Sequence, residues 1–357
     1  MLLTDPRGAT SAGIVAQRLL DALSRPVLLE GMRIDVGASI GVSLFPDHGD
    51  SPSELLRASD IAMYAAKANG GGEHSLYEQG AHIDDRTRLA LVGGFTDALD
   101  SGEIEVHYQP RFDVLSGRLT GVEALVRWRH PQLGLLPPGA FLPGIERSAL
   151  IFTLTEHVLS TALHDTARWL VSRPDLSVAV NLSTRLLHSA DLPTTVRDAL
   201  ARAGVPPQRL ELEVTETMIM AHPGRALELL GQLDDSGVRI AVDDFGVGHA
   251  SLAYLTDLPV SILKIDRSFI ERMKHSDRHA AVVAAILDLA DHLGMVSVAE
   301  GIEDEETLQQ LSALGCDEAQ GYLLARPMPA SEIDDLITGR AWGNREMTAG
   351  ARRDLPV

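Results

Sequence analysis

Carboxylate side chains cluster at the ends of three short apolar runs in this sequence. The runs are LELEVTE at 210–216, IAVDDFG at 240–246 and VSVAEGIE at 296–303. Apolar runs of this length are typical of buried strands, and the acids come where apolar sequence gives way to polar sequence. Because converging carboxylates cannot all stay ionised without a cation, the pattern indicates a divalent metal site. Such a site favours a hydrolase.

Strand-like and helix-like segments alternate over the part of the chain that carries these acids. Eight strands with intervening helices over about 250 residues predict an α/β fold, a modified TIM (β/α)8 barrel. The first two strands are joined only by a short turn at 116–119, so we expect that pair to be antiparallel. Helical patterns lie at 152–172, 225–237 and 280–294. The predicted strands are 104–110, 121–128, 177–183, 210–216, 239–245, 261–269, 296–302 and 317–324.

The carboxyl ends of the predicted strands carry oxygen donors and one lysine. In a barrel of this type those ends form the active face. Carboxylate and amide oxygens suit Mg²⁺ or Mn²⁺ better than zinc, which prefers His and Cys. Taken singly, each acid could be a helix N-cap or a solvated loop charge, and Lys264 could be a surface lysine. Several strand ends that all deliver oxygen donors to the same face favour a functional site instead. The residues are Glu123, Asn181, Glu213, Asp243, Asp244, Lys264, Glu300 and Gln320.

Charge and composition limit the partners of the chain. The 357 residues include 31 Lys and Arg against 50 Asp and Glu, a net charge of −19, so the surface as a whole should repel nucleic acid and anionic membrane. The single cysteine, Cys316, excludes an internal disulfide framework and fits a reducing cytoplasm. No apolar stretch is long enough to span a membrane, and the first ten residues lack the apolar core of a signal peptide.

The first 80 residues have a pattern of their own. The sequence at 32–45 predicts a strand pair or one long bent strand, and a helix follows it. Ser51 and Glu54 have the spacing of a capping box, with Pro52 at the first helical position. The glycines at 70–72 predict a hinge before a further helical segment at 86–102. The polar tail at 341–357 is expected to be disordered.

Residues 84–340 resemble the EAL family of cyclic di-GMP phosphodiesterases. The defining Glu-Ala-Leu is Glu123-Ala124-Leu125, within GVEALVRWRHP. The resemblance implies a modified TIM barrel with an antiparallel early strand, and hydrolysis of cyclic di-GMP to linear pGpG in bacterial second-messenger signalling. It also implies a homodimer formed through the barrel. The other matching motifs, in family order, are YQP (108–110), VNLS (180–183), ELEVTE (211–216), DDFGVG (243–248), LKIDRSF (263–269), VAEGIE (298–303) and QGYLLARP (320–327).

The resemblance also implies a role for each matching residue. Lys264 would position the attacking water, and Glu300 would act as general base or as a further metal ligand. Glu216 would brace the loop after Asp244. The ligands of two Mg²⁺ or Mn²⁺ ions would be Glu123, Asn181, Glu213, Asp243 and Asp244. The contacts to the dinucleotide would be Gln109, Leu125, Arg127, Glu303 and Gln320.

Residues 1–80 resemble the C-terminal half of a GGDEF diguanylate cyclase domain, through ASIGVSLFP (38–46) and LLRASDIAMYAAKANG (55–70). The signature loop and its preceding metal ligand are missing, so we expect a truncated fragment without cyclase activity. The loop after DDFG also departs from the EAL family pattern, at Val247, His249 and Ala250. Two alternatives to the phosphodiesterase are a catalytically silent cyclic di-GMP receptor and a protein-interaction module.

Overall fold

The computed structural model describes residues 9–23, 27–29, 32–34, 38–49, 51–68, 74–77, 85–246, 255–274 and 276–338. The chain forms two compact units, Met1–Glu105 with Arg127–Arg147, and Val106–Val126 with Ser148–Val357. The predicted hinge at 70–72, the altered loop residues at 247–250 and the tail at 341–357 lie outside the described residues. Within the described ranges, no helix has both the length and the apolar character needed to cross a bilayer.

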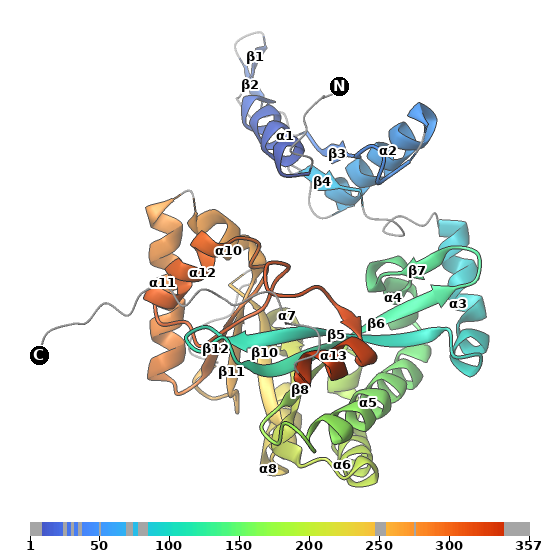
Figure 1. The fold of residues 1–357 in the computed structure, drawn as a ribbon, viewed down its shortest axis with the longest axis vertical. Helices are drawn as coiled ribbons and strands as arrows, with labels where there is room; N and C mark the ends of the chain where they lie inside the picture. Colours follow the sequence, from blue (N-terminus) through green and yellow to red (C-terminus); the bar gives the residue numbers. More distant parts are fainter. Residues whose placement is uncertain are drawn as a thin grey trace, which may run out of the picture. The chain divides into compact units, whose positions relative to one another are not determined.

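Short strands and two helices form the beginning of the first unit (Figure 1). β1 pairs antiparallel with β2, whereas β3 pairs parallel with β4. The prediction of one strand pair or one bent strand over 32–45 is therefore wrong, because β2 and β3 pair with different partners. The elements are α1 (Ala9–Leu23), β1 (Val27–Leu29), β2 (Met32–Ile34), β3 (Ile40–Val42), α2 (Pro52–Ala68) and β4 (His74–Leu76).

The capping box predicted at the start of the second helix is confirmed. The Ser51 amide donates to Glu54 Oε2 at 3.2 Å, and the Glu54 amide donates to Ser51 Oγ at 3.3 Å. These two bonds satisfy backbone donors that the first helical turn leaves without partners. Pro52 is the first residue of α2, where its missing N–H costs nothing.

An aromatic cluster holds the later part of the first unit together. Phe95 of α3 (Asp85–Asp100) packs edge to face on Trp128, with ring centroids 5.8 Å apart. Phe141 of α4 (Pro138–Glu146) meets the same indole at 5.5 Å. The Trp128 indole N–H donates to Glu103 at 2.9 Å, so the only polar atom of this side chain is satisfied. β7 (Gly134–Leu136) pairs antiparallel with the end of β6 (Leu119–His130).

Eight strands close into a barrel. Their order is β5–β13–β12–β11–β10–β9–β8–β6, and a further pairing of β5 with β6 completes the circle. From β6 round to β13 the neighbours are parallel, whereas β5 runs antiparallel to β13. The predicted modified barrel with an antiparallel first strand is thus confirmed. The strands are β5 (Ile104–Asp113), β6 (Leu119–His130), β8 (Ser177–Asn181), β9 (Leu210–Thr215), β10 (Arg239–Phe245), β11 (Ile262–Ile265), β12 (Val296–Ala299) and β13 (Glu318–Ala319).

Helices cover the outside of the barrel, with α10, α11 and α12 along one side of the strands and α5 and α6 along another (Figure 1). The three predicted helical patterns are confirmed as α5, α8 and α11. The sixth predicted strand is too long, because the Asp266 side chain accepts the Ser268 amide at 3.0 Å and caps α10. The eighth is also too long, since β13 has two residues. The helices are α5 (Leu150–Trp169), α6 (Leu192–Ala203), α7 (Glu216–Ala221), α8 (Pro223–Asp235), α10 (Arg267–Met273), α11 (Asp277–His292), α12 (Glu305–Ala313) and α13 (Ala330–Ile337). The short strand β14 (Met328–Pro329) pairs antiparallel with β5.

A buried ion-pair network lies between the strands on the inner side of the barrel. Arg111 Nη2 is 2.6 Å from Glu211 Oε2, and both side chains are almost fully buried. Arg239 lies 2.9 Å from the other oxygen of Glu211. Burial alone would raise the pKa of Glu211, but Arg111 and Arg239 outweigh it and lower the pKa. The network therefore keeps a charged carboxylate inside the barrel.

Replacing Arg111 with glutamine should strongly destabilise the barrel. Removing one partner of a buried ion pair leaves an uncompensated charge, and we expect the free energy of unfolding to fall by about 3–5 kcal/mol. Arg118→Gln is the matched control, because Arg118 forms an exposed pair with Asp175 at 2.7 Å; that change should cost less than about 1 kcal/mol. Urea unfolding of the two variants measures the difference. Equal losses would show that the buried network contributes no special stability.

Candidate active site

The strands of the barrel bring the predicted donors to one end of its interior. In the parallel pairing of β8 with β9, Asn181 lies beside Glu213. Glu213 itself lies beside Ala241 of β10, two residues before Asp243. Because successive side chains alternate between the two faces of a strand, Ala241 and Asp243 share a face. The barrel topology therefore places acidic residues that are far apart in the sequence close together in one cluster.

Lys264 is the centre of that cluster. Its side chain is 1% exposed, and its Nζ lies 2.8 Å from Glu213 Oε1 and 2.8 Å from Glu300 Oε1. Asp243 Oδ1 follows at 3.2 Å and Glu123 Oε2 at 3.7 Å. One ammonium thus faces four carboxylates. The alternative that Lys264 is an ordinary surface lysine is wrong, since the side chain is buried.

Two amide side chains orient Glu123. Asn181 Nδ2 donates to Glu123 Oε1 at 2.8 Å, and Gln320 Nε2 donates to Glu123 Oε2 at 2.6 Å. Gln320 Nε2 also lies 3.1 Å from Gln109 Oε1, and Gln109 Nε2 donates to the Ala325 carbonyl at 3.1 Å. A chain of hydrogen bonds therefore fixes the orientation of the Gln320 and Gln109 side-chain amides.

Burial and mutual repulsion shift the pKa values of these groups. Burial, together with the charges of Glu123 and Asp243, raises the pKa of Glu213 well above its ordinary value. Burial also raises the pKa of Glu300 to about 8, although Lys264 acts in the opposite direction. Burial alone would lower the pKa of Lys264, but the surrounding carboxylates outweigh it and raise the pKa well above normal. A single lysine cannot neutralise the whole cluster.

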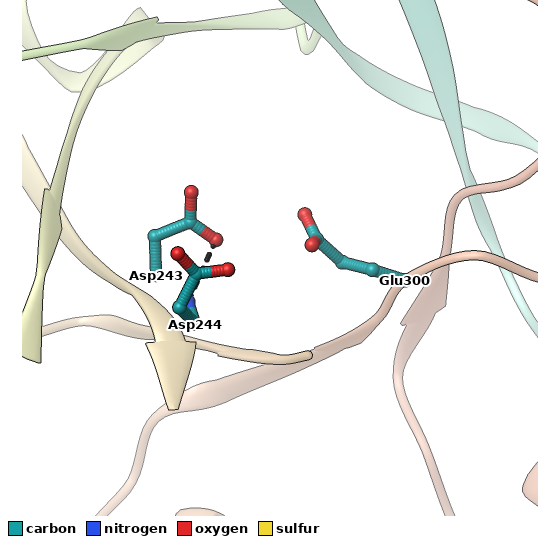
Figure 2. Close-up of side chains that lie close together, drawn as sticks. All are labelled: Asp243, Asp244 and Glu300. Atoms are coloured by element: carbon teal, nitrogen blue, oxygen red, sulfur yellow. Dashed lines mark hydrogen bonds between the residues drawn. The ribbon is translucent and has the colours of Figure 1, made fainter. Parts of the chain in front are cut away.

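Asp243, Asp244 and Glu300 offer a set of oxygens close enough for one ion. One carboxylate oxygen of each lies within 4.8 Å of the others. Figure 2 shows the two aspartates side by side, with Glu300, which follows β12, extending toward them. Asp244 has φ of 53°, a left-handed conformation that Asp tolerates better than most residues, and its amide donates to Asp243 Oδ1 at 3.0 Å. Partial desolvation and the charge of Asp243 raise the pKa of Asp244 to about 6.

A divalent cation fits this cluster on two grounds. Within the part of the chain that the structure describes, Glu213 Oε2 and Gln320 Oε1 are buried and accept no hydrogen bond. Buried polar atoms normally have partners, so such atoms at the edge of an acidic cluster point to a missing ligand. The donors are also hard oxygens throughout, with no His or Cys, which is the set that Mg²⁺ and Mn²⁺ prefer.

The remaining predicted residues lie around the cluster or apart from it. Glu216 accepts the Gly246 amide at 3.3 Å, a bond at the start of the segment that follows Asp244. Leu125 is half-buried on β6. Glu303 is exposed and paired with Arg267 at 2.8 Å, so the structure joins it to α10 rather than to the acids. Arg127, also half-buried, belongs to the first compact unit.

Sequence reasoning missed Arg267. It binds Glu303 and also Glu271, with 2.7 Å between Nη2 and Oε1 of the latter. The four-residue spacing of Arg267 and Glu271 on a helix could have indicated the second pair. Nothing in the spacing indicates the first pair, because Glu303 follows a different strand.

The fold and the oxygen-rich end of the barrel define the class: a modified (β/α)8 barrel with an acidic cluster that could hold a metal ion. The EAL domain family matches residues 94–327, and the chain belongs to that family. The family "Diguanylate cyclase, GGDEF domain" matches residues 1–73.

Characterised relatives and solved structures agree with this assignment. The chain is 40% identical over 334 residues to the bifunctional diguanylate cyclase/cyclic di-GMP phosphodiesterase MucR of Pseudomonas aeruginosa, covering 93% of this chain and 49% of MucR. It is 36% identical to the cyclic di-GMP phosphodiesterase NbdA of the same organism, covering 94% of this chain and 43% of NbdA. The chain thus spans about half of these relatives or less. A structure of the PaMucR phosphodiesterase in complex with c-di-GMP has a TM-score of 0.66 and 44% identity, covering 68% of this chain and 99% of that one. The EAL enzyme Bd1971, in a form with cAMP and cyclic di-GMP bound, has a TM-score of 0.68 and 29% identity, with coverage of 82% and 77%.

Proposed function

We propose that this chain is a metal-dependent phosphodiesterase that hydrolyses one phosphodiester of cyclic di-GMP to give linear pGpG. The observation that carries the proposal is the position of Lys264, buried among four carboxylates at the carboxyl end of an EAL barrel. Loss of that lysine would have favoured a binding protein without catalysis, and it is present here. The relatives named as cyclic di-GMP phosphodiesterases, and the c-di-GMP complex of a similar barrel, support the choice of substrate.

Two Mg²⁺ or Mn²⁺ ions complete this proposal. Glu123, Asn181, Glu213, Asp243 and Asp244 would hold them. When bound, such ions polarise a phosphoryl oxygen and neutralise negative charge that develops on it. Glu213 Oε2, which is buried and accepts no hydrogen bond among the described residues, supports this arrangement because a cation would satisfy it.

The residues of the chain itself then supply the proton transfer. Lys264 holds the attacking water by a hydrogen bond, and Glu300, whose oxygen lies 2.8 Å from the same ammonium, accepts its proton. The water oxygen forms a bond to phosphorus as the bond to the 3′ oxygen breaks. The proton accepted by Glu300 then passes to the departing 3′ oxygen, so that one water is consumed and Glu300 is ionised again. Only the ionised form of the Glu300 carboxylate can accept this proton, so Glu300 must be ionised when the water attacks.

Substrate contacts form a second group of residues in the proposal. Gln109, Leu125, Arg127, Glu303 and Gln320 would hold the dinucleotide. With a chain charge of −19, a phosphate ligand needs local cations, and Arg127 meets that need. A cytoplasmic location and a homodimer formed through the barrel also remain predictions; light scattering after gel filtration tests the second.

Incubation with cyclic di-GMP and Mn²⁺, followed by chromatography, tests the proposed activity. Linear pGpG should accumulate as the cyclic dinucleotide disappears. Glu123→Gln is the matched negative variant, since it keeps the shape of the side chain and removes its charge. Binding of cyclic di-GMP without any pGpG would favour the silent receptor instead.

Arg127→Ala should weaken substrate binding far more than turnover. A charge-assisted phosphate contact contributes about 1.5–3 kcal/mol, so Kd for cyclic di-GMP should rise roughly tenfold to a hundredfold. Arg129→Ala is the control, because Arg129 lies two residues further on the same strand and binds Glu105, with 2.9 Å between Nη2 and Oε2. Calorimetric titration in Ca²⁺ measures both affinities. An unchanged Kd for Arg127→Ala would remove this residue from the binding site.

The first 80 residues should make no cyclic di-GMP. A cyclase requires its signature loop and a metal ligand, and the sequence contains neither. Incubation of the chain with GTP and Mg²⁺ should yield no cyclic product. Because the phosphodiesterase could remove a product, the assay is repeated with Glu123→Gln. Synthesis in either case would contradict the prediction.

A further inference from the structure

A cavity lies on the outer side of the barrel wall, apart from the acidic cluster. Its volume is about 210 Å³, and it is lined by α5, α6, residues of β8 and β9, and the connection between β8 and α6. Its walls are largely apolar, with contributions from Leu159, Leu182, Leu186 and Val196. None of the residues that line it belongs to the acidic cluster.

Two exposed carboxylates stand at the edge of this cavity. Glu156 projects from α5, and Asp191 precedes the first residue of α6. Asp191 occupies the N-cap position but makes no side-chain capping bond. Within the described part of the chain neither carboxylate takes part in a hydrogen bond or ion pair. The nearby cation Arg185 lies over the Phe152 ring, 5.9 Å from its centroid. Among the described residues, the carboxylates of Glu156 and Asp191 are therefore available to a positively charged group.

We propose that this cavity binds a small organic amine whose apolar part is a single ring. An apolar cavity of about 150 Å³ is large enough to hold benzene, so this one has room for a ring with a short side arm. The apolar walls select the ring, and the two rim carboxylates select a protonated amine over an anion.

The position of the cavity couples it to the acidic cluster. Val180 and Leu212 line the cavity and are paired in register on β8 and β9. The next pair in that register is Asn181 with Glu213, which face the other side of the wall. An occupant that displaces Val180 and Leu212 moves Asn181, which donates to Glu123, and Glu213, which accepts from Lys264. This coupling rests on the proposed function, whereas the binding site does not.

Benzylamine, benzyl alcohol and benzoate are the probes, used with the full chain in calorimetric or ligand-observed NMR titrations. Benzylamine should bind at a single site, and about three- to tenfold more tightly than benzyl alcohol, as expected for exposed charge pairs. Benzoate should bind more weakly than either. The double change Glu156→Gln with Asp191→Asn should reduce the benzylamine affinity to that of benzyl alcohol. Asp288→Asn, an exposed acid on α11, is the matched control and should change nothing.

Filling the cavity separates this site from the acidic cluster, which could also attract an amine. Val196→Phe should abolish binding of both benzylamine and benzyl alcohol; Thr195→Leu replaces it if thermal melting shows that the first variant unfolds. Saturable benzylamine binding that survives the filling, or equal affinity for benzoate, would overturn the binding site. Cyclic di-GMP should change the Kd for benzylamine, and by linkage benzylamine should change the Kd for cyclic di-GMP by the same factor. An unchanged Kd would overturn the coupling, whereas failure to bind cyclic di-GMP at all would instead count against the proposed function.

Discussion

Removal of divalent ions should abolish hydrolysis of cyclic di-GMP by this chain. Added Mg²⁺ or Mn²⁺ should restore it, because small hard cations suit the carboxylate and amide oxygens of the cluster. Ca²⁺ should inhibit, since its larger and looser coordination shell fits poorly. We expect no pGpG to form after chelation and dialysis, which is a complete loss of activity. Full activity in excess chelator would contradict the metal-dependent proposal.

The same experiment needs a measure of folding. Lys264 lies within 2.8–3.7 Å of four carboxylates, so the cluster retains a counter-ion when metal is absent. We therefore expect the stripped chain to keep its circular dichroism spectrum and a cooperative melting transition. Loss of structure on chelation would make the metal a structural element, and the loss of activity would then not report on chemistry.

The bounds of a barrel strand can be predicted from the sequence where its apolar run is long and has polar residues at both ends. β10 has the bounds that the sequence predicts, and β9 differs by one residue. The bounds of β13 could not be predicted in this way, because its two residues carry no periodic pattern and only its neighbours β12 and β5 define it as a strand. Whether such a short segment forms a strand depends on its pairing with distant segments and not on its local sequence preference.

The candidate site follows from the topology more than from any single motif. Parallel strands deliver their carboxyl ends to one end of the barrel, so the convergence of Glu213, Asp243 and Glu300 could be predicted from strand positions. The distances could not. That Lys264 Nζ contacts four carboxylates depends on how far its side chain reaches across the interior, and strand spacing does not contain that information.

Lys264→Ala should reduce kcat by about a hundredfold to ten-thousandfold, with KM changed only a few-fold. A group that holds the attacking water acts mainly on the transition state, so its loss appears in kcat rather than in binding. The variant also leaves carboxylates without their cation, so assays require saturating Mn²⁺ and a thermal melt. Lys274→Ala is the control, because Lys274 pairs with Asp304 at the edge of the barrel. Turnover at the wild-type rate would remove Lys264 from the mechanism.

Glu300→Gln then decides what the neighbouring carboxylate does. As general base, its loss should lower kcat to a similar degree while the number of bound Mn²⁺ ions stays the same. As a metal ligand, its loss should reduce the bound metal, because the Asp243, Asp244 and Glu300 oxygens lie within 4.8 Å of one another. Metal content by mass spectrometry, measured beside kcat and cyclic di-GMP affinity, separates the two roles. A variant with both full metal content and wild-type kcat would exclude both of them, and Glu300 would act only as a partner of Lys264.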